Sequence, residues 1–390
     1  MLARMIRSRK KARTQEATPL LYADTQHSAD QLYFGNVSVP DPFVAIGPAG
    51  RKIAVVSALE YSRVVKESDF EVVLPLETLR AEARRRFPRS DGGPAGVIRV
   101  LAARYGITCF RIPYAFPAGL AFALRKAGVR LEVAAGALFP ERAHKSDSEA
   151  AEIRKANRVA AAGFRRVEQI LAESVARRGR LYWCEAALTS ERAREEIGKV
   201  CLERNALASG TIVAGGDQAC DPHCRGSGPL RPNELIIVDI FPRLDGSGYH
   251  GDMTRTYLKG RPTAAQRKLV ATVREAHRRA IDRIAPGRSA DAIHRDTVRY
   301  FEEAGYPTER RDGAHCGFFH GLGHGLGLEV HEAPRLAPNA APLKRGHVVT
   351  VEPGLYYPGL GGCRIEDVVR VGGATGCERL SRHPYRWCYA

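Results

Sequence analysis

The segment FFHGLGHGLGLEVHEAP at residues 318–334 decides the fold, together with HVVTVEPGLYYPG at 347–359 and CRIEDVVRV at 363–371. These strings place ionisable side chains among apolar residues and glycines, where a charge is costly unless another group compensates it. The residues concerned are His320, His324, His331, Glu352 and Glu366. A bound metal is the simplest compensation, so this part of the chain predicts a metal centre.

The same pattern occurs once upstream, in the strings LIIVDIF and YHGDMTRTYL. Asp239 and Asp252 lie 13 residues apart there, and Glu352 and Glu366 lie 14 residues apart downstream. Each pair occupies two β-rich runs joined by a glycine-bearing turn, which is typical of an antiparallel hairpin with one inward carboxylate per strand. Two such hairpins facing each other would bring four carboxylates together.

Four ionised carboxylates in one cleft repel one another and shift one another's pKa values. Two divalent cations would balance that charge, and a neutral imidazole such as His324 could complete the ligand shell. Oxygen-rich ligation with one nitrogen and no thiolate favours manganese, cobalt, iron or zinc over a structural cysteine site.

The strings VDIF, GDMTRT, HGLGHGLGLEVHE, TVEPGLYY and RIED resemble the pita-bread metallopeptidases, in particular aminopeptidase P and prolidase, over Ser146 to Val371. The resemblance implies an α+β catalytic domain with a pseudo-twofold pair of β-hairpins, preceded by an α/β domain like that of creatinase and prolidase. The chain departs from the family between Asp239 and Asp252, where it has two extra residues. These fall in the turn RLDGSG, so we expect a longer loop and unmoved ligands.

The resemblance also implies a ligand set for two divalent ions, with manganese as the first candidate and cobalt, zinc or iron as alternatives. His324 and Glu352 would hold one ion and Asp239 the other, while Asp252 and Glu366 would bridge them.

Further polar residues would face the substrate. Glycines alternate around His320 and His324, which argues against a helix and lets a ligand approach the backbone. By resemblance, His320, His331 and His223 would contact the substrate, although His320 could instead orient a ligand. Arg364 could bind substrate, but we favour a role in orienting a carboxylate.

The expected reaction is attack of a hydroxide on the scissile carbonyl of a peptide bond. The resemblance alone implies that this bond precedes proline, so that the partner is a peptide with proline at its second position. Glu352 would pass on the proton, while His331 and His223 would stabilise the oxyanion. We favour an Xaa-Pro aminopeptidase over an Xaa-Pro dipeptidase, because no arginine obviously matches the one that prolidases use to bind the dipeptide's carboxylate. The candidates for that role are Arg335, Lys344 and Arg345.

A non-catalytic pita-bread binding protein is an alternative of another class. Such relatives lose metal ligands, whereas this chain keeps all five.

The expected domain order is a basic arm at 1–18, an α/β domain at 19–145 and the catalytic domain at 146–390. A capping box of Ser146 and Glu149 opens a long helix at the boundary, and further helices are expected after Thr189, Thr263 and Ser289. By resemblance, the N-terminal domain would shape the substrate entrance and help form a homodimer or homotetramer.

Composition excludes several classes of protein. The chain has 390 residues of which 44% are hydrophobic, which suits two globular domains. It lacks a membrane-length apolar run and a secretory signal, so we expect a cytoplasmic protein.

The net charge of +17 is spread along the chain without a nucleic-acid-binding motif, which makes nucleic acid an unexpected partner. The nine cysteines form no disulfide pattern, and Cys220, His223 and Cys224 lack the second pair of a zinc finger.

Overall fold

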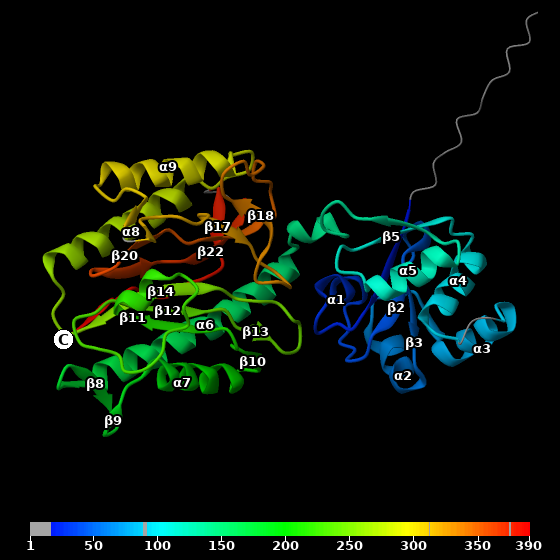
Figure 1. Cartoon of the computed structure of the whole chain (residues 1–390), viewed down its shortest axis with the longest axis horizontal. Coiled ribbons are helices and arrows are strands. Elements are labelled where there is room, and N and C mark those ends of the chain that lie inside the picture. The colour runs from blue at the N-terminus through cyan, green and yellow to red at the C-terminus, as the bar shows by residue number, and fades with distance from the viewer. Residues whose placement is uncertain (1–16, 89–91, 312, 374–375) are drawn as a thin grey trace, which may run out of the picture. The chain divides into compact units, whose positions relative to one another are not determined.

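In a computed structural model, the chain folds into two compact units, Met1–Pro140 and Glu141–Ala390 (Figure 1). The expected basic arm falls almost entirely on residues 1–16, outside the described residues, and the first strand begins at Thr18. The residues that the structure describes are 17–88, 92–311, 313–373 and 376–390.

The first unit is built on one six-stranded sheet with the order β4-β3-β2-β1-β5-β6. The pairs β3–β4, β1–β5 and β5–β6 are parallel, and the pairs β1–β2 and β2–β3 are antiparallel. The strands are β1 (Thr18–Ala23), β2 (Phe43–Ile46), β3 (Ile53–Val56), β4 (Val72–Pro75), β5 (Cys109–Ile112) and β6 (Arg130–Val133). The helices are α1 (Ala29–Gly35), α2 (Ala58–Glu67), α3 (Leu76–Arg86), α4 (Pro94–Tyr105) and α5 (Ala118–Lys126).

The central strands of this sheet are apolar at every position because both of its faces are covered. In β2, Val44 and Ile46 pack into one core with residues of α3, α4 and α5. Phe43 and Ala45 point to the opposite face and pack with residues of α1 and α2. This arrangement confirms the predicted α/β class of the first unit.

Helices in the second unit begin where their capping residues predict. At the start of α6, the backbone N–H of Glu149 donates to Ser146 Oγ, and that of Ser146 donates to Glu149 Oε2. Thr263 and Gln266 form the same reciprocal pair at the start of α8. These helices and two others are α6 (Asp147–Glu173), α7 (Ser190–Leu202), α8 (Ala264–Asp282) and α9 (Ala290–Glu303).

Strands of the second unit form two main sheets, with the orders β11-β12-β14-β24 and β18-β17-β19-β22-β23. The first comprises β11 (Ile212–Gly215), β12 (Ile236–Ile240), β14 (Met253–Lys259) and β24 (Cys388–Tyr389). The second comprises β17 (Gly323–Gly325), β18 (Glu332–Leu336), β19 (Val348–Val351), β22 (Asp367–Val371) and β23 (Cys377–Arg379). Smaller sheets contain β7 (Val175–Arg177), β8 (Arg180–Trp183), β9 (Ala186–Ala187), β10 (Ala206–Leu207), β13 (Arg243–Leu244), β15 (Glu309–Arg311), β16 (Ala314–Cys316), β20 (Gly354–Tyr357) and β21 (Gly361–Arg364).

Both predicted hairpins are present as antiparallel pairs. In the first, Asp239 of β12 lies opposite Thr254 of β14. In the second, Val351 of β19 lies opposite Asp367 of β22, and the chain between these strands forms the additional pair β20–β21. The acids therefore sit at or beside the strand ends rather than in the middle of the strands.

Each hairpin has its own pair of covering helices, on opposite sides of the strands in Figure 1. Residues of α6 and α7, such as Phe164 and Ile197, share a core with β12 and β14. Residues of α8 and α9, such as Val273 and Phe301, share a core with β19 and β22. The second unit is thus a pseudo-symmetric α+β structure whose two hairpins face each other. Within the described residues, none of the helices has the length and apolar character that crossing a bilayer requires.

Candidate metal centre

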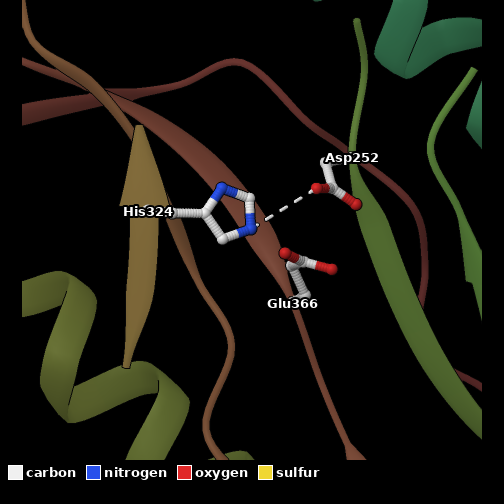
Figure 2. Close-up of side chains that lie close together, drawn as sticks. All are labelled: Asp252, His324 and Glu366. Carbon is white, nitrogen blue, oxygen red and sulfur yellow. Dashed lines mark ion pairs between the residues drawn. The ribbon is translucent and has the colours of Figure 1, made fainter. Parts of the chain in front are cut away.

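Three side chains from different strands converge to form a cluster that could hold a metal ion. Asp252 directly precedes β14, His324 lies in β17, and Glu366 directly precedes β22. One ligand atom from each lies within 4.8 Å of the others, and all three residues are buried. Figure 2 shows the imidazole and the two carboxylates pointing toward a common centre.

Glycines allow β17 to carry His324 deep into the structure. A Cβ atom at Gly323 would lie 2.0 Å from the carbonyl oxygen of Thr350, and one at Gly325 would lie 2.2 Å from that of Ala333. Neither backbone neighbour could move aside without breaking the sheet, so the alternating glycines are required for this close approach. The strand also confirms the prediction that this segment is not a helix.

Hydrogen bonds orient the His324 ring toward the acids. Nδ1 donates to the carbonyl oxygen of Gly325 at 3.1 Å, which leaves the lone pair on Nε2. Nε2 lies 3.7 Å from Asp252 Oδ2 and 3.3 Å from Glu352 Oε1. Burial lowers the pKa of His324 to about 3, so the ring is neutral and suited to ligate a cation.

The other two predicted ligands, Asp239 and Glu352, line the same cavity, which has a volume of about 1110 Å³. Asp239 Oδ2 accepts a hydrogen bond from Arg364 at 2.8 Å, and its buried Oδ1 has no hydrogen-bond partner among the described residues. Glu352 accepts a long hydrogen bond of 3.4 Å from Thr350. All five predicted ligands are therefore brought to one cavity, with three in the tight cluster.

Electrostatics within the cavity favour a bound cation. Burial raises the pKa of Asp252 well above its usual range, and the charges of Glu366, Asp239 and Glu352 raise it further. Burial and the charges of Glu352 and Asp239 do the same for Glu366. Burial also raises the pKa of Glu352 to about 7. Crowded carboxylates with one neutral imidazole and an unpartnered oxygen are a donor set that fits divalent metal ions.

Two of the histidines expected to meet the substrate are exposed on the cavity wall. His223 lies in the loop before β12, and His331 lies just before β18. The His331 ring packs edge to face with that of His324, with 4.3 Å between the ring centres. Both rings can therefore reach a molecule that enters the cavity.

His320 lines the same cavity, but protein groups occupy both of its ring nitrogens. Nδ1 donates to the carbonyl oxygen of Gly321 at 2.8 Å, and Nε2 accepts from the Tyr356 hydroxyl at 2.9 Å. Tyr356 in turn accepts from Arg364 at 3.0 Å. This geometry suits the orienting role of His320 better than substrate contact.

Arg364 is buried behind the carboxylates. Its guanidinium donates to Asp239 Oδ2 at 2.8 Å and to Thr254 Oγ1 at 3.2 Å, and Thr254 donates to Glu366 Oε2 at 2.8 Å. Arg364 thus positions ligands of both hairpins. The sequence analysis missed Tyr356 and Thr254, although Thr254 could have been found because it lies two residues after Asp252, on the same strand face.

One of the three candidate carboxylate-binding residues reaches the cavity. Arg335 of β18 lies opposite His324 of β17 in the strand register and lines the cavity wall. Neither Lys344 nor Arg345 is among the described residues that line it. Cys220 and Cys224 belong to no metal-binding group within the part of the chain that the structure describes.

Comparisons with known proteins agree with this centre. The model of metallopeptidase family M24 matches residues 151–372. The Xaa-Pro dipeptidase of Pyrococcus furiosus is 35% identical over 208 residues, which cover 51% of this chain and 56% of that protein. The chain spans about half the length of the curated relatives it matches, with 56%, 40% and 46% of three of them covered.

Solved structures resemble the whole chain. The Xaa-Pro dipeptidase from Bacillus anthracis has a TM-score of 0.77 at 24% identity, covering 96% of this chain and 95% of that chain. The X-Pro aminopeptidase from Thermotoga maritima MSB8 has a TM-score of 0.76 at 22% identity, covering 96% and 97%. Likeness at these identities concerns the fold alone, and it confirms the expected α/β domain followed by a pita-bread domain.

Proposed function

Because this chain belongs to metallopeptidase family M24, we propose that it is a divalent-metal peptidase that hydrolyses dipeptides of the form Xaa-Pro. The observation that carries the dipeptide preference is the position of Arg335, directly across the β17–β18 ladder from His324. The proline preference is supported by the printed names of the curated relatives, several of which are Xaa-Pro dipeptidases.

In this proposal the two hairpins share two divalent ions. The residues that would hold the ions are His324, Glu352, Asp239, Asp252 and Glu366. When bound, such ions act as Lewis acids and allow water to serve as a nucleophile at neutral pH. Manganese is our first candidate, because the donor set is rich in oxygen and contains a single nitrogen.

Protein groups around the centre perform the remaining steps. The carboxylate of Glu352 takes the proton of the attacking water and passes it to the leaving amine, since it lines the cavity close to His324. The exposed rings of His331 and His223 hold the scissile carbonyl oxygen as negative charge develops on it. Arg364 keeps Asp239 oriented throughout, through a hydrogen bond of 2.8 Å.

Arg335 would bind the C-terminal carboxylate of the dipeptide. The position of the C-terminal carboxylate distinguishes the two kinds of substrate. A dipeptide carries it on the proline, next to the scissile bond, whereas a longer peptide carries it farther from that bond. A guanidinium beside the metal ligands suits the first case, since it can donate two hydrogen bonds to one carboxylate. The proposal therefore differs from the aminopeptidase activity that the sequence alone favoured.

Xaa-Pro aminopeptidase activity is the second candidate. The cavity volume of about 1110 Å³ exceeds the space that a dipeptide fills, so a longer peptide could also enter. Under this alternative, Arg335 would contact a side chain or no part of the substrate.

Hydrolysis of Ala-Pro and of Ala-Pro-Ala by the manganese-loaded protein separates the two candidates. We expect faster cleavage of Ala-Pro, and a loss of about 10- to 100-fold in kcat/KM for that dipeptide in Arg335→Gln, since a charge-assisted contact is lost. Arg345→Gln is the matched control, because Arg345 does not line the cavity and its loss should leave both rates unchanged.

Each other outcome has a clear meaning. Cleavage of Ala-Pro-Ala with no cleavage of Ala-Pro would establish the aminopeptidase. Binding of less than one equivalent of divalent metal, without cleavage of either peptide, would point to a binding protein of the same fold.

A further inference from the structure

A second cavity of about 670 Å³ lies in the same unit as the metal centre but is lined by other residues. It is bounded by α8, by residues of β14 and β22, and by the C-terminal segment that follows β22. None of the residues assigned above to catalysis or to metal binding lines it within the described part of the chain.

Arginines surround this cavity. Along α8, Arg267 is followed seven residues later by Arg274 and four residues after that by Arg278, a spacing that places all three on one helix face. Arg255 of β14 and Arg379 of β23 complete the set. Five guanidinium groups from three elements therefore border one cavity.

Carboxylates neutralise only part of this charge. Glu275 accepts hydrogen bonds of 2.8 Å from both Arg278 and Arg279. Arg267 and Arg274 have no ion-pair partner among the residues that the structure describes.

The other carboxylate in the cavity, Asp367, is also fully engaged. It lies 2.9 Å from Arg255 and 3.7 Å from Arg379, and it accepts a hydrogen bond of 2.7 Å from Ser381. Five guanidinium groups and two carboxylates line the cavity, which leaves an excess of three positive charges. Two of these charges are those of Arg267 and Arg274.

The rear wall also keeps an unused donor. Arg255 is only 3% exposed, and its two Nη groups donate to Thr254, Glu366 and Asp367. Its Nε is buried and has no hydrogen-bond partner among the described residues. Arg255 therefore adds positive charge at the wall, whereas its Nε is covered by neighbouring atoms and is not itself within reach of a ligand in the cavity.

Aromatic rings form the remaining wall. The ring of Tyr385 lies near the guanidinium groups of Arg274 and Arg255, with its centre 5.8 and 5.9 Å from their central carbons. Its hydroxyl donates to the carbonyl oxygen of Thr256 at 3.2 Å, which fixes the ring in place. Trp387 lines the same cavity and is one of two tryptophans in the chain.

We propose that this cavity binds a small anion that bears phosphate groups. Guanidinium groups match phosphate oxygens with paired hydrogen bonds. Arg267 and Arg274 are exposed at the cavity and have no carboxylate partner among the described residues that a phosphate group would need to displace. A phosphate group can arrive as inorganic phosphate or as part of a nucleotide, whose base could pack on Tyr385 or Trp387.

Emission from Trp387 tests this site directly. In a Trp183→Phe background, Trp387 is the only tryptophan, so its emission reports on this cavity and not on the metal centre. Inorganic phosphate and ADP are titrated separately into the metal-loaded protein, with chloride added to keep the ionic strength constant. We expect a saturable change that becomes at least about tenfold weaker in affinity when Arg267 and Arg274 are both replaced by Gln.

The matched control removes two positive charges that lie away from the cavity, one directly after α8 and one in α9. Arg283 and Arg299 both pair with Asp296 and do not line the cavity, so their double replacement by Gln should leave the affinity unchanged. Peptidase activity should be retained in both double variants, which shows that they fold.

Two results distinguish the source of the phosphate, and two overturn the proposal. Saturation by inorganic phosphate assigns binding to the phosphate group alone, whereas saturation only by ADP assigns it to a nucleotide. Absence of a saturable change with both ligands, or an unchanged affinity after replacement of Arg267 and Arg274, overturns the proposal.

Discussion

Glu366 and Asp367 are neighbours in the chain and are both buried, at 2% and 4% exposure, yet their surroundings are opposite. Glu366 faces the metal cavity, where burial and the charges of Glu352 and Asp239 raise its pKa well above the usual range. Asp367 faces the other side of the strand. Burial raises its pKa, but the charge of Arg255 and the other contacts on that side outweigh this effect and lower the pKa below 3.8.

The contrast separates two uses of a buried acid. Asp367 has its counter-charge within the protein, through Arg255 at 2.9 Å and a further contact to His277 at 3.3 Å, so the acid stabilises the fold. Glu366 is bonded by the neutral Thr254 hydroxyl and is surrounded by other acids. Arg364 supplies one positive charge beside several carboxylates, so the remaining counter-charge must come from outside the chain, which is the expected property of a metal ligand.

The largest expected effect is on the metal-facing side. Glu352→Gln should lower kcat by about 10²- to 10⁴-fold, because the amide cannot take the proton of the attacking water. In metal-free protein, its thermal unfolding should stay close to that of the parent, because burial already disfavours the charge that the substitution removes.

Steady-state kinetics on Ala-Pro with a parallel unfolding curve measures both quantities. Glu195→Gln, an exposed glutamate on α7, is the control for a change of the same type. A fully active Glu352→Gln variant would remove Glu352 from the reaction.

A substitution on the opposite side of the strand should instead lower the stability of the fold. Asp367→Asn leaves the buried guanidinium of Arg255 without its charge partner, so the free energy of unfolding should fall by about 3 to 5 kcal/mol. Glu366→Gln, measured in metal-free protein, should be neutral or stabilising, because it removes a carboxylate from a repelling group.

Urea unfolding of the two variants with EDTA present tests this pair. An equal loss of stability in both variants would show that the two sides of the strand do not differ in the way described.

Much of this arrangement could be predicted from the sequence because its signals are local. The reciprocal bonds of Ser146 with Glu149 and of Thr263 with Gln266 depend on a spacing of three residues, so the helix starts are correct. The glycines around His324 predict extended backbone for the same reason. The motifs also named the three residues that form the tight cluster in the structure.

Features that depend on strand register could not be predicted. Arg335 reaches the cavity because β18 pairs with β17 across an irregularity after His324, and no local pattern specifies that register. Likewise, the two acids in the string RIED differ through tertiary partners, of which Arg255 and Thr254 lie more than 100 residues away in the sequence. Their different roles required the tertiary structure.

A moderate effect is expected at Thr254, whose hydroxyl links the first hairpin to Glu366 and Arg364 of the second. Thr254→Val removes the hydrogen bond to Glu366 Oε2 and the acceptor for Arg364 Nε, so manganese affinity should fall by about 10- to 100-fold. Thr256→Val is the matched control on the same strand face, because the Thr256 hydroxyl bonds the backbone of Arg364 and none of the proposed metal ligands. Competition with a fluorescent chelator measures the affinities, and equal losses in both variants would contradict the role of Thr254.

The smallest expected effect is a dependence on pH that has opposite sign for the two neighbouring acids. A carboxyl group whose pKa is raised by folding binds more protons in the folded state than in the unfolded state, so its contribution to stability is lost as pH rises. Glu366 is such a group. In metal-free protein, the melting temperature of Glu366→Gln minus that of the parent should therefore increase from pH 4.5 upward.

Asp367 should behave in the reverse way, because its pKa is lowered by folding. Its contribution is complete above pH 3.8 and is lost as pH falls through its folded pKa, so the deficit of Asp367→Asn should shrink only in acid. Taking the difference between each variant and the parent cancels the contribution of buried histidines that contact neither acid. One of these is His250, whose pKa burial lowers to about 4 and whose neutral state makes stability rise with pH up to about 6.5. Each kcal/mol should appear as a shift of about 2 to 4 °C in thermal unfolding. Parallel pH profiles for the two variants would mean that one environment governs both acids, and the assignment of Glu366 to a metal would lose its electrostatic basis.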